Sequence, residues 1–375
     1  MTTRLDALDA AEAEPDPDSL SAGERLRRSF PADDVAWALT QVALRRKAGG
    51  RLERADEMLF TPAGAEQATR SSVARWRAER FAAAGVRRVW DIGCGIGADA
   101  MAFAEAGLDV VAVDADPGTV DVATHNLALV GAGPAHVGRA EELEVPAGDA
   151  VFLDPARRTA RGRTWRVEDF TPPWPLVLEH LSSPRFVAVK LGPGVPKELL
   201  PREAQRTWVS DGGDVVEASL WNRLDPGPVA VRIDPGIHTL RDAGRALDVR
   251  PLGRYLAEPD GAVIRAGLVA EAAGDCDAWL LDEHVAYLSS DTPIDTGWVT
   301  NFEVLDVLDY DRKALKAYVR DHRIGRLEIK KRAIDVDPAE LRRALRPKGP
   351  AAATIIIART AEGTRAVVAR RLALG

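Results

Sequence analysis

The chain has 375 residues, 46% of them hydrophobic and 29% charged, which is typical of a folded protein of two or three domains and excludes wholesale disorder or a fibrous repeat. The formal net charge of −7 excludes a uniformly basic nucleic-acid coat protein but not a local basic face. With two cysteines and no apolar run long enough to span a bilayer, we expect a cytoplasmic protein without a disulfide scaffold, a metal or a membrane anchor.

The chain begins with a predicted tail and a helical segment. Residues 1–20 are acidic and contain almost no large apolar side chains, so we expect them to be disordered. Over residues 21–86 the apolar side chains recur three or four positions apart, which predicts helices. Within this segment, Thr61 and Pro62 are typical of the N-cap and first turn of a helix.

A parallel α/β sheet is predicted over residues 87–236. Short β-rich runs alternate there with helical stretches. The first four runs cover residues 89–92, 110–113, 150–153 and 186–189. Two later runs, separated by Ser, Asp and Gly, predict an antiparallel hairpin that closes the sheet. Residues 245–375 mix short strands with helices, which indicates a separate, smaller α+β domain.

A glycine-rich segment follows the first predicted strand and leads into a helix. Its glycines, Gly93, Gly95 and Gly97, would let a ligand approach the backbone and the helix N-terminus. Asp114 ends the second strand, where a carboxylate suits a ribose hydroxyl. This spacing fits a dinucleotide site as well as other nucleotide-type sites.

Asp91 favours a cationic ligand. Two residues before the first glycine, a carboxylate would repel a pyrophosphate, whereas S-adenosylmethionine brings an ammonium and a sulfonium to that place. The pattern Asp-x-Gly-x-Gly-x-Gly, followed by Asp114, resembles class I S-adenosylmethionine-dependent methyltransferases, with another nucleotide fold or a degenerate, non-binding copy as the alternatives. The resemblance implies a Rossmann-like fold and S-adenosylmethionine as the cofactor. The cofactor-binding residues in this segment would be Asp91, Gly93, Cys94, Gly95, Gly97, Asp99, Asp114, Ala115 and Glu141.

Two of these acids have alternative interpretations. In the family a third acid usually meets the adenine amino group, and here Arg139 stands where that acid is often found, so Glu141 is its substitute. Asp99 either faces the positive end of the helix dipole or helps to hold the methionine ammonium.

Asp154 and Pro155 end the fourth predicted strand, where open α/β sheets place reactive groups. Amino-group methyltransferases carry Asp/Asn/Ser-Pro-Pro-aromatic there, and the first side chain accepts a hydrogen bond from the exocyclic amine. We therefore predict Asp154 and Pro155 as the catalytic residues. Because Ala156 and Arg157 replace the second proline and the aromatic residue, stacking on a base would come from elsewhere, for example from Trp174, or would not occur.

Cations surround this predicted acceptor site. Five arginines lie in the loop after Asp154, and we expect Arg157 and Arg158 among them to contact substrate phosphates, with solvated loop arginines as the alternative. Lys190, at the end of the next strand, is either a cation on the substrate side or a member of a structural ion pair.

Two further resemblances involve longer parts of the chain, and the second of them covers roughly residues 50–372. The run DEMLFTP at residues 56–62 is similar to RNA cap guanine-N2 methyltransferases, which implies that Phe60 and Thr61 fold over the cofactor. The complete order looks like bacterial class I methyltransferases with a C-terminal THUMP-like domain, on the runs GRYLAEPD, VIRAGL and GRLEIKKR at residues 253–260, 263–268 and 325–332. THUMP domains hold structured RNA in RNA-modifying enzymes, which implies RNA as a partner.

The charge of this C-terminal region agrees with RNA as a partner. Residues 312–348 carry 13 Lys and Arg against 5 acidic residues, a net charge of +8. We expect Lys330, Lys331 and Arg332 to contact RNA phosphates, with a solvated basic face as the alternative. The prediction is a methyltransferase that modifies a base nitrogen in rRNA or tRNA. Its alternatives are a methyltransferase with a small-molecule or protein acceptor, and a non-catalytic RNA-binding protein with a decayed methyltransferase domain.

Overall fold

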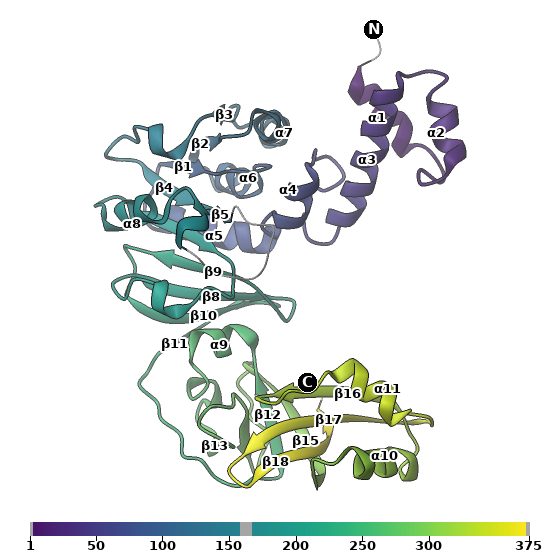
Figure 1. Ribbon diagram of the computed structural model, residues 1–375. Helices are drawn as coiled ribbons and strands as arrows, with labels where there is room; N and C mark the ends of the chain where they lie inside the picture. The colour runs from purple at the N-terminus through teal and green to yellow at the C-terminus, as the bar shows by residue number, and fades with distance from the viewer. Residues whose placement is uncertain (1–2, 158–166, 373–375) are drawn as a thin grey trace. The chain divides into compact units, whose positions relative to one another are not determined.

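The structure is a computed structural model that describes residues 3–157 and 167–372 (Figure 1). The chain divides into two compact units: Met1–Gln205 with Ala218–Pro226, and Arg206–Glu217 with Gly227–Gly375. This boundary differs from the expected limit at residue 236. Two strands before that limit, β8 (Gln205–Asp211) and β10 (Gly227–Ile233), fall largely in the second unit. There β10 packs against α9 (Gly261–Ala266).

Three helices form an N-terminal module in the first unit. They are α1 (Arg4–Glu12), α2 (Leu20–Leu26) and α3 (Ala32–Ala48). Residues 1–20 were expected to be disordered, and the structure differs: Thr3 caps α1, and Ala7, Leu8 and Ala11 are buried in a small core against α3. The buried face of α1 is narrow and consists mainly of alanine. A prediction based on large apolar side chains therefore misses it.

The first unit contains a six-stranded part of a sheet, in the order β9-β7-β4-β1-β2-β3, to which β9 contributes only its second half, from Ala218 onward. The strands are β1 (Arg88–Ile92), β2 (Asp109–Asp114), β3 (His136–Val137), β4 (Ala150–Leu153), β7 (Val187–Leu191) and β9 (Asp214–Trp221). All neighbours are parallel except β9, which is antiparallel to β7. The predicted parallel α/β sheet is therefore confirmed.

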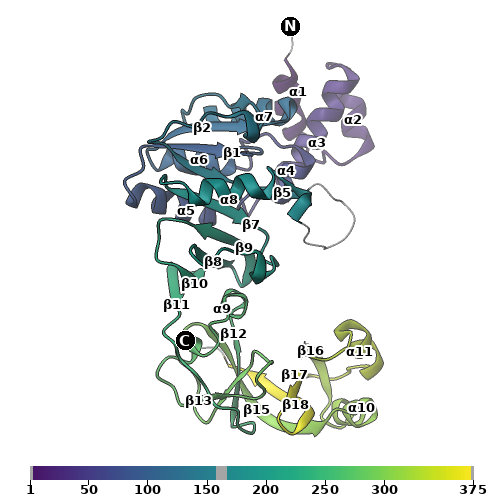
Figure 2. The same cartoon turned by 60° about the vertical axis from the view of Figure 1, so that its left-hand side comes forward.

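Helices accompany these strands, as Figure 2 shows. They are α4 (Pro62–Gln67), α5 (Ser71–Ala83), α6 (Ala98–Glu105), α7 (Pro117–Ala128) and α8 (Trp174–Ser182), with 3-10 turns η1 (Ala140–Glu142), η2 (Val167–Asp169) and η3 (Lys197–Leu199). β5 (Ala156–Arg157) pairs with β6 (Phe170–Thr171). β4 is buried throughout, as expected for a strand covered on both faces. Ile92 at the end of β1 pairs with Val113 on β2 and with Leu153 on β4. The carboxyl ends of these three strands therefore meet at one edge of the sheet.

The second unit contains β8, β10 and β11 (Ile237–Arg241), and a seven-stranded sheet of order β13-β14-β12-β15-β18-β17-β16. The seven strands are β12 (Tyr255–Pro259), β13 (Ala278–Leu280), β14 (Leu288–Ser290), β15 (Val299–Asp309), β16 (Ile324–Arg332), β17 (Ala351–Thr360) and β18 (Gly363–Arg371). Besides α9, the helical elements are η4 (Glu271–Ala273), α10 (Arg312–Asp321) and α11 (Pro338–Leu345).

The two faces of the seven-stranded sheet differ. On β17, Ile355 and Ile357 pack with Leu315 of α10, whereas Ile356 packs on the opposite face with Phe302. On that second face, Lys330 of β16 reaches Glu258 of β12, with 2.6 Å between Nζ and Oε2, although three strands separate β12 from β16 in the sheet order. The sheet is therefore strongly curled. Within the described residues, no helix is long and apolar enough to cross a membrane.

Candidate active site

The predicted glycine loop connects β1 to α6. Gly93, Gly95 and Gly97 have φ values of +82°, +55° and +84°, in the left-handed region that disfavours any residue with a Cβ. A Cβ on Gly93 would also lie 3.3 Å from the carbonyl oxygen of Asp154. The loop conformation therefore depends on its glycines, and it brings the ends of β1 and β4 close together.

Asp114 holds this loop in place. Its Oδ2 accepts a hydrogen bond from the Gly95 amide at 3.0 Å, and its Oδ1 accepts one from the Asp116 amide at 3.0 Å. A carboxylate can accept further hydrogen bonds, so these contacts leave capacity for a ribose hydroxyl. Ala115 is exposed beside it.

Asp91 is fully buried at the end of β1. Neither of its carboxylate oxygens has a hydrogen-bond partner among residues 3–157 and 167–372. Burial raises the pKa of Asp91 well above its ordinary value, and the charges of Asp99 and Asp154 raise it further, while Lys190 and Arg77 oppose them. A buried carboxyl without a partner costs about 1–3 kcal/mol, so this arrangement suits a ligand that brings a cation or a donor.

Asp99, by contrast, already has partners within the protein. One oxygen is bound by the guanidinium of Arg77, and the other accepts a hydrogen bond from the Thr69 hydroxyl at 2.6 Å. Arg77 is fully buried on α5 and lies over the ring of Phe152, with 4.6 Å to the centroid. These contacts give Asp99 a structural use, and its contact with a cofactor stays a prediction. The sequence signal for Arg77 is weak: an arginine four residues after Val73 on an apolar helix face.

Asp154 forms an ion pair with Lys190. The strands β4 and β7 are neighbours, and the Lys190 Nζ lies 2.7 Å from Oδ2 of Asp154. The side chain of Lys190 is 14% exposed and that of Asp154 34%. Among the described side chains, none bonds to Oδ1 of Asp154. Lys190 thus holds one oxygen of Asp154, and the other oxygen is open at the strand end. Of the two interpretations of Lys190, the structure shows the ion pair.

The turn at Phe60 and Thr61 lies against the glycine loop. Phe60 shares a buried core with Ile96 of that loop, and Thr61 caps α4 by accepting a hydrogen bond from the Gly64 amide at 3.0 Å. A Cβ on Gly64 would lie only 2.2 Å from Cγ2 of Ile96. The start of α4 therefore packs directly on the loop.

This close contact leads to a stability prediction. Replacing Gly64 with alanine should lower the free energy of unfolding by about 1–3 kcal/mol, because the added methyl group overpacks the contact with Ile96. Denaturant unfolding of the full chain would measure the loss. The matched control is Gly148→Ala, since a Cβ at Gly148 would meet nothing within 4 Å. Equal stability of the two variants would show that α4 does not pack on the loop in this way.

Asn126 is a buried residue that the sequence analysis missed. Its Nδ2 donates to the carbonyl oxygens of Ile96 and Leu59, at 2.8 and 3.0 Å, and its Oδ1 accepts from the Leu59 amide at 2.8 Å. Asn126 therefore ties the glycine loop to the segment before Phe60. The available signal was a polar side chain on the apolar face of the helix, next to Leu127.

Two other predicted cofactor residues are Glu141 and Cys94. Glu141 follows β3 and forms an ion pair with Arg139, with 3.6 Å between their charged atoms. Cys94 is buried, and burial raises the pKa of its thiol. Both residues remain predictions as cofactor contacts.

The predicted substrate residues are not all brought together. Trp174 begins α8, is 6% exposed and packs against Phe170, with 5.3 Å between the ring centroids. Arg157 belongs to β5, and Arg158 lies outside the described residues. Stacking of Trp174 on a base stays a prediction, since its ring is largely used in packing.

In the second unit, Lys330, Lys331 and Arg332 divide between the two faces of β16. Lys330 and Arg332 both bind Glu258, Lys330 with 2.6 Å between Nζ and Oε2 and Arg332 with 3.4 Å between a terminal guanidinium nitrogen and Oε1. Lys331 points to the opposite face and is exposed. The structure therefore pairs two of the three predicted phosphate contacts with an acid.

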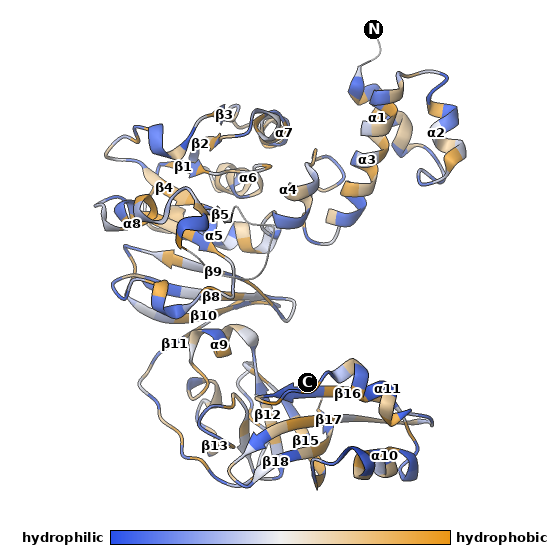
Figure 3. Cartoon of the chain, in the orientation of Figure 1, coloured by the Kyte–Doolittle hydropathy of each residue, from blue (hydrophilic) through white to orange (hydrophobic). Residues whose placement is uncertain are grey.

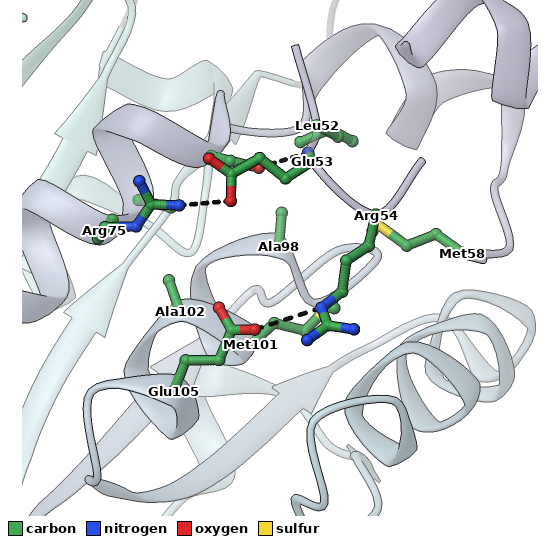
Figure 4. A pocket seen from close by; sticks show the side chains of 11 residues that line it. Leu52, Glu53, Arg54, Met58, Arg75, Ala98, Met101, Ala102 and Glu105 are labelled. Carbon is green, nitrogen blue, oxygen red and sulfur yellow. Dashed lines mark hydrogen bonds and ion pairs between the residues drawn. The ribbon is translucent and has the colours of Figure 1, made fainter. Parts of the chain in front are cut away.

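A hollow lies between residues 52–58, α5 and α6 (Figure 4). Its lining includes Leu52 and Met58, and Arg54 forms an ion pair across it with Glu105 at 3.3 Å. The acids at the ends of β1, β2 and β4 do not line it, so it is separate from the candidate active site. The described residues contain no group of three or more His, Cys, Asp or Glu able to hold a metal.

Comparison with known proteins identifies three regions of the chain. Residues 90–154 match the model of a methyltransferase domain, and residues 299–371 match that of a THUMP domain-like family. Residues 5–48 match a domain of unknown function. The methyltransferase match ends at Asp154 and includes the glycine loop.

Relatives extend over nearly the whole chain. The chain is 35% identical over 346 residues to an uncharacterized S-adenosylmethionine-dependent methyltransferase of Mycobacterium tuberculosis. The aligned residues cover 88% of this chain and 95% of the relative. The fold resembles the crystal structure of a protein of Porphyromonas gingivalis W83 assigned as a methyltransferase, with a TM-score of 0.73, 18% identity and 92% of each chain covered. S-adenosylmethionine is accordingly the cofactor. The chain belongs to the family of class I S-adenosylmethionine-dependent methyltransferases that carry a C-terminal THUMP-like domain.

Proposed function

We propose that this protein methylates a nitrogen of a base in structured RNA, either rRNA or tRNA. The observation that best supports RNA as the substrate is a set of exposed cations on the THUMP-like domain that have no acidic partner among the described residues. The cofactor site and the open carboxylate of Asp154 support the chemistry.

The candidate cofactor residues fit S-adenosylmethionine. Asp91 offers a buried, unpartnered carboxylate to a cationic ligand, and the glycines allow a close approach to the backbone. Asp114 keeps acceptor capacity for a ribose hydroxyl, and Phe60 and Thr61 form a wall beside the loop. When bound, the cofactor supplies a methyl group carried on a sulfonium.

Asp154 would orient the acceptor nitrogen. Because Lys190 holds Oδ2, the open Oδ1 can accept an N–H hydrogen bond from the base and so direct the nitrogen lone pair toward the cofactor. Transfer to nitrogen needs no covalent intermediate, only alignment and the loss of one proton. The 34% exposure of Asp154 lets that proton pass to solvent.

Acidic residues within the protein already neutralise some cations of the THUMP-like domain. Between residues 312 and 348, Lys330 and Arg332 bind Glu258, Arg312 binds Glu340, and Arg320 binds Asp321. The other nine cations are exposed and have no acidic partner within 4.0 Å among the described residues. We call them the free cations: Lys313, Lys316, Arg323, Arg326, Lys331, Arg342, Arg343, Arg346 and Lys348.

Four of the nine free cations belong to α10 and α11, which pack against each other on one face of the sheet. Figure 3 shows hydrophilic residues along α10 and hydrophobic ones along β17. Cations without carboxylate partners can neutralise phosphates and release counterions, whereas cations already paired gain less. This favours the α10–α11 face for RNA over the face that carries Lys330 and Arg332.

The salt dependence of RNA binding tests this assignment. Changing Lys313, Lys316 and Arg343 together to glutamine should weaken binding and reduce the slope of log affinity against log salt by about 2–3. The matched control changes Arg250, Arg320 and Arg370 to glutamine, because each is exposed and paired with an acid. We expect the control triple to keep the slope of the unmodified protein. Equal slopes for the two triples would contradict the α10–α11 assignment, and binding without salt dependence would contradict RNA as the partner.

A further inference from the structure

The N-terminal module, α1 to α3, lies beside the segment that leads to Phe60 and Thr61. Its core joins Leu8 of α1 to Val35 and Val42 of α3, with Leu59 packed against its edge. Residues 5–48 match a domain of unknown function. The contacts of α3 with residues 57–60 indicate what this module does.

Gln41 of α3 forms hydrogen bonds with both the amide and the carbonyl group of Phe60. Its Nε2 donates to the Phe60 carbonyl oxygen at 2.8 Å, and its Oε1 accepts from the Phe60 amide at 2.9 Å. Gln41 is 3% exposed. One buried amide side chain thus satisfies both polar backbone groups of Phe60, and losing it would leave them without partners in the core.

Arg45 acts on the same segment one turn later in α3. Its Nε donates to the Met58 carbonyl oxygen at 2.8 Å, and a terminal nitrogen donates to that of Glu57 at 3.0 Å. The other terminal nitrogen binds Glu12 of α1 at 2.6 Å. The guanidinium therefore links α1 and α3 to two successive carbonyl groups.

The opposite side of this segment meets the cofactor loop. Asn126 holds both polar backbone groups of Leu59 and also the carbonyl oxygen of Ile96 in the glycine loop. Phe60 shares the core of Ile96, and Gly64 has no room for a side chain against it. Residues 57–60 thus lie between α3 on one side and the cofactor loop on the other.

We propose that the N-terminal module is a positioning element of the cofactor site, with Gln41 and Arg45 as its positioning residues. It fixes residues 57–60, and through them the wall at Phe60 and Thr61, in the conformation that accepts S-adenosylmethionine. A site that adopts its binding conformation only part of the time binds with an affinity reduced by that fraction. The proposal rests on the proposed placement of the cofactor at the glycine loop and is independent of the RNA substrate.

Calorimetric binding of S-adenosylhomocysteine to the full chain tests the proposal. Gln41→Met keeps the length of the side chain and removes both hydrogen bonds, and we expect it to weaken binding at least tenfold at a temperature well below unfolding. Hydrogen exchange should show faster exchange of the Phe60 amide. The matched control is Arg46→Gln on the same helix, where Arg46 is exposed and, within the described part of the chain, its side chain binds only Asp18, at 3.1 Å. It should change neither affinity nor exchange.

The outcomes separate positioning from general stability. Faster exchange at Phe60 with affinity within twofold of the unmodified protein would overturn the proposal, and so would unchanged exchange. If Gln41→Met does not fold, Arg45→Met removes the bonds to the carbonyl groups of Met58 and Glu57, and we expect it to weaken binding as well. An affinity of Arg45→Met within twofold of the unmodified protein would then overturn the proposal. Failure of RNA binding or RNA methylation would leave these measurements unaffected, whereas failure of the unmodified protein to bind S-adenosylhomocysteine would overturn the cofactor site and this proposal together.

Discussion

Replacing Asp91 with asparagine should weaken the binding of S-adenosylhomocysteine about a hundredfold while leaving the fold intact. The amide has the shape of the carboxyl but cannot carry the negative charge that faces the ligand ammonium. A hundredfold loss corresponds to about 2.8 kcal/mol, which is in the range of one charge pair at an effective dielectric constant of about 20. Calorimetry measures the affinity, and thermal unfolding checks the fold. An affinity within threefold of the unmodified protein would place the ammonium elsewhere.

The raised pKa of Asp91 adds a pH dependence to this prediction. Burial, reinforced by Asp99 and Asp154, raises the pKa, so between the ordinary and the raised value the folded chain holds a proton that the unfolded chain has lost. The stability contributed by this proton is therefore present at low pH and lost as the pH rises through the folded pKa. A bound cation favours the carboxylate and releases the proton, so affinity should rise with pH by up to about tenfold per unit. The Asp91→Asn variant should lack this slope.

Replacing Asp154 with alanine should reduce methyl transfer to RNA by about a thousandfold and leave the affinity for S-adenosylhomocysteine within threefold. The variant loses the acceptor that orients the nitrogen, an effect in the range of about 10²–10⁴ for positioned proton-accepting groups. Single-turnover transfer from labelled cofactor measures the rate. The matched control is Asp109→Ala, which removes an exposed carboxylate at the other end of β2, where it pairs with Arg88.

Parallel losses of rate and cofactor affinity in Asp154→Ala would place Asp154 in the cofactor site instead. An unchanged rate would remove Asp154 from the acceptor site. Lys190→Met should give a smaller loss of rate than Asp154→Ala, because it frees Oδ2 but keeps the carboxylate. These three results together distinguish an orienting carboxylate from a structural one.

The sequence was sufficient for those parts of the site that follow from strand order. Asp91 lies one residue before the end of a short apolar run, Asp114 and Asp154 directly follow such runs, and parallel neighbouring strands bring these ends to one edge. The three glycines were predicted because their spacing opens a helix after a strand. Lys190 was predicted at the same rim for the same reason, and only its partner required the structure.

Contacts between distant segments could not be predicted in this way. Gln41 meets Phe60 because of how α3 packs, and Lys330 meets Glu258 because the seven-stranded sheet curls. Neither the packing nor the curl leaves a local pattern. The buried face of α1 was missed for a different reason: Ala7 and Ala11 bury little apolar area each, yet at helical spacing they suffice to pack against α3.

The most direct test of the proposed function is methyl transfer from labelled S-adenosylmethionine by the purified protein to total RNA. The RNA is prepared from cells that lack the gene and, separately, from cells that carry it. We predict that label enters RNA from the deficient cells and not RNA from the others, in which the position is already methylated. Absence of label in both RNA samples, or label that resists ribonuclease, would contradict it.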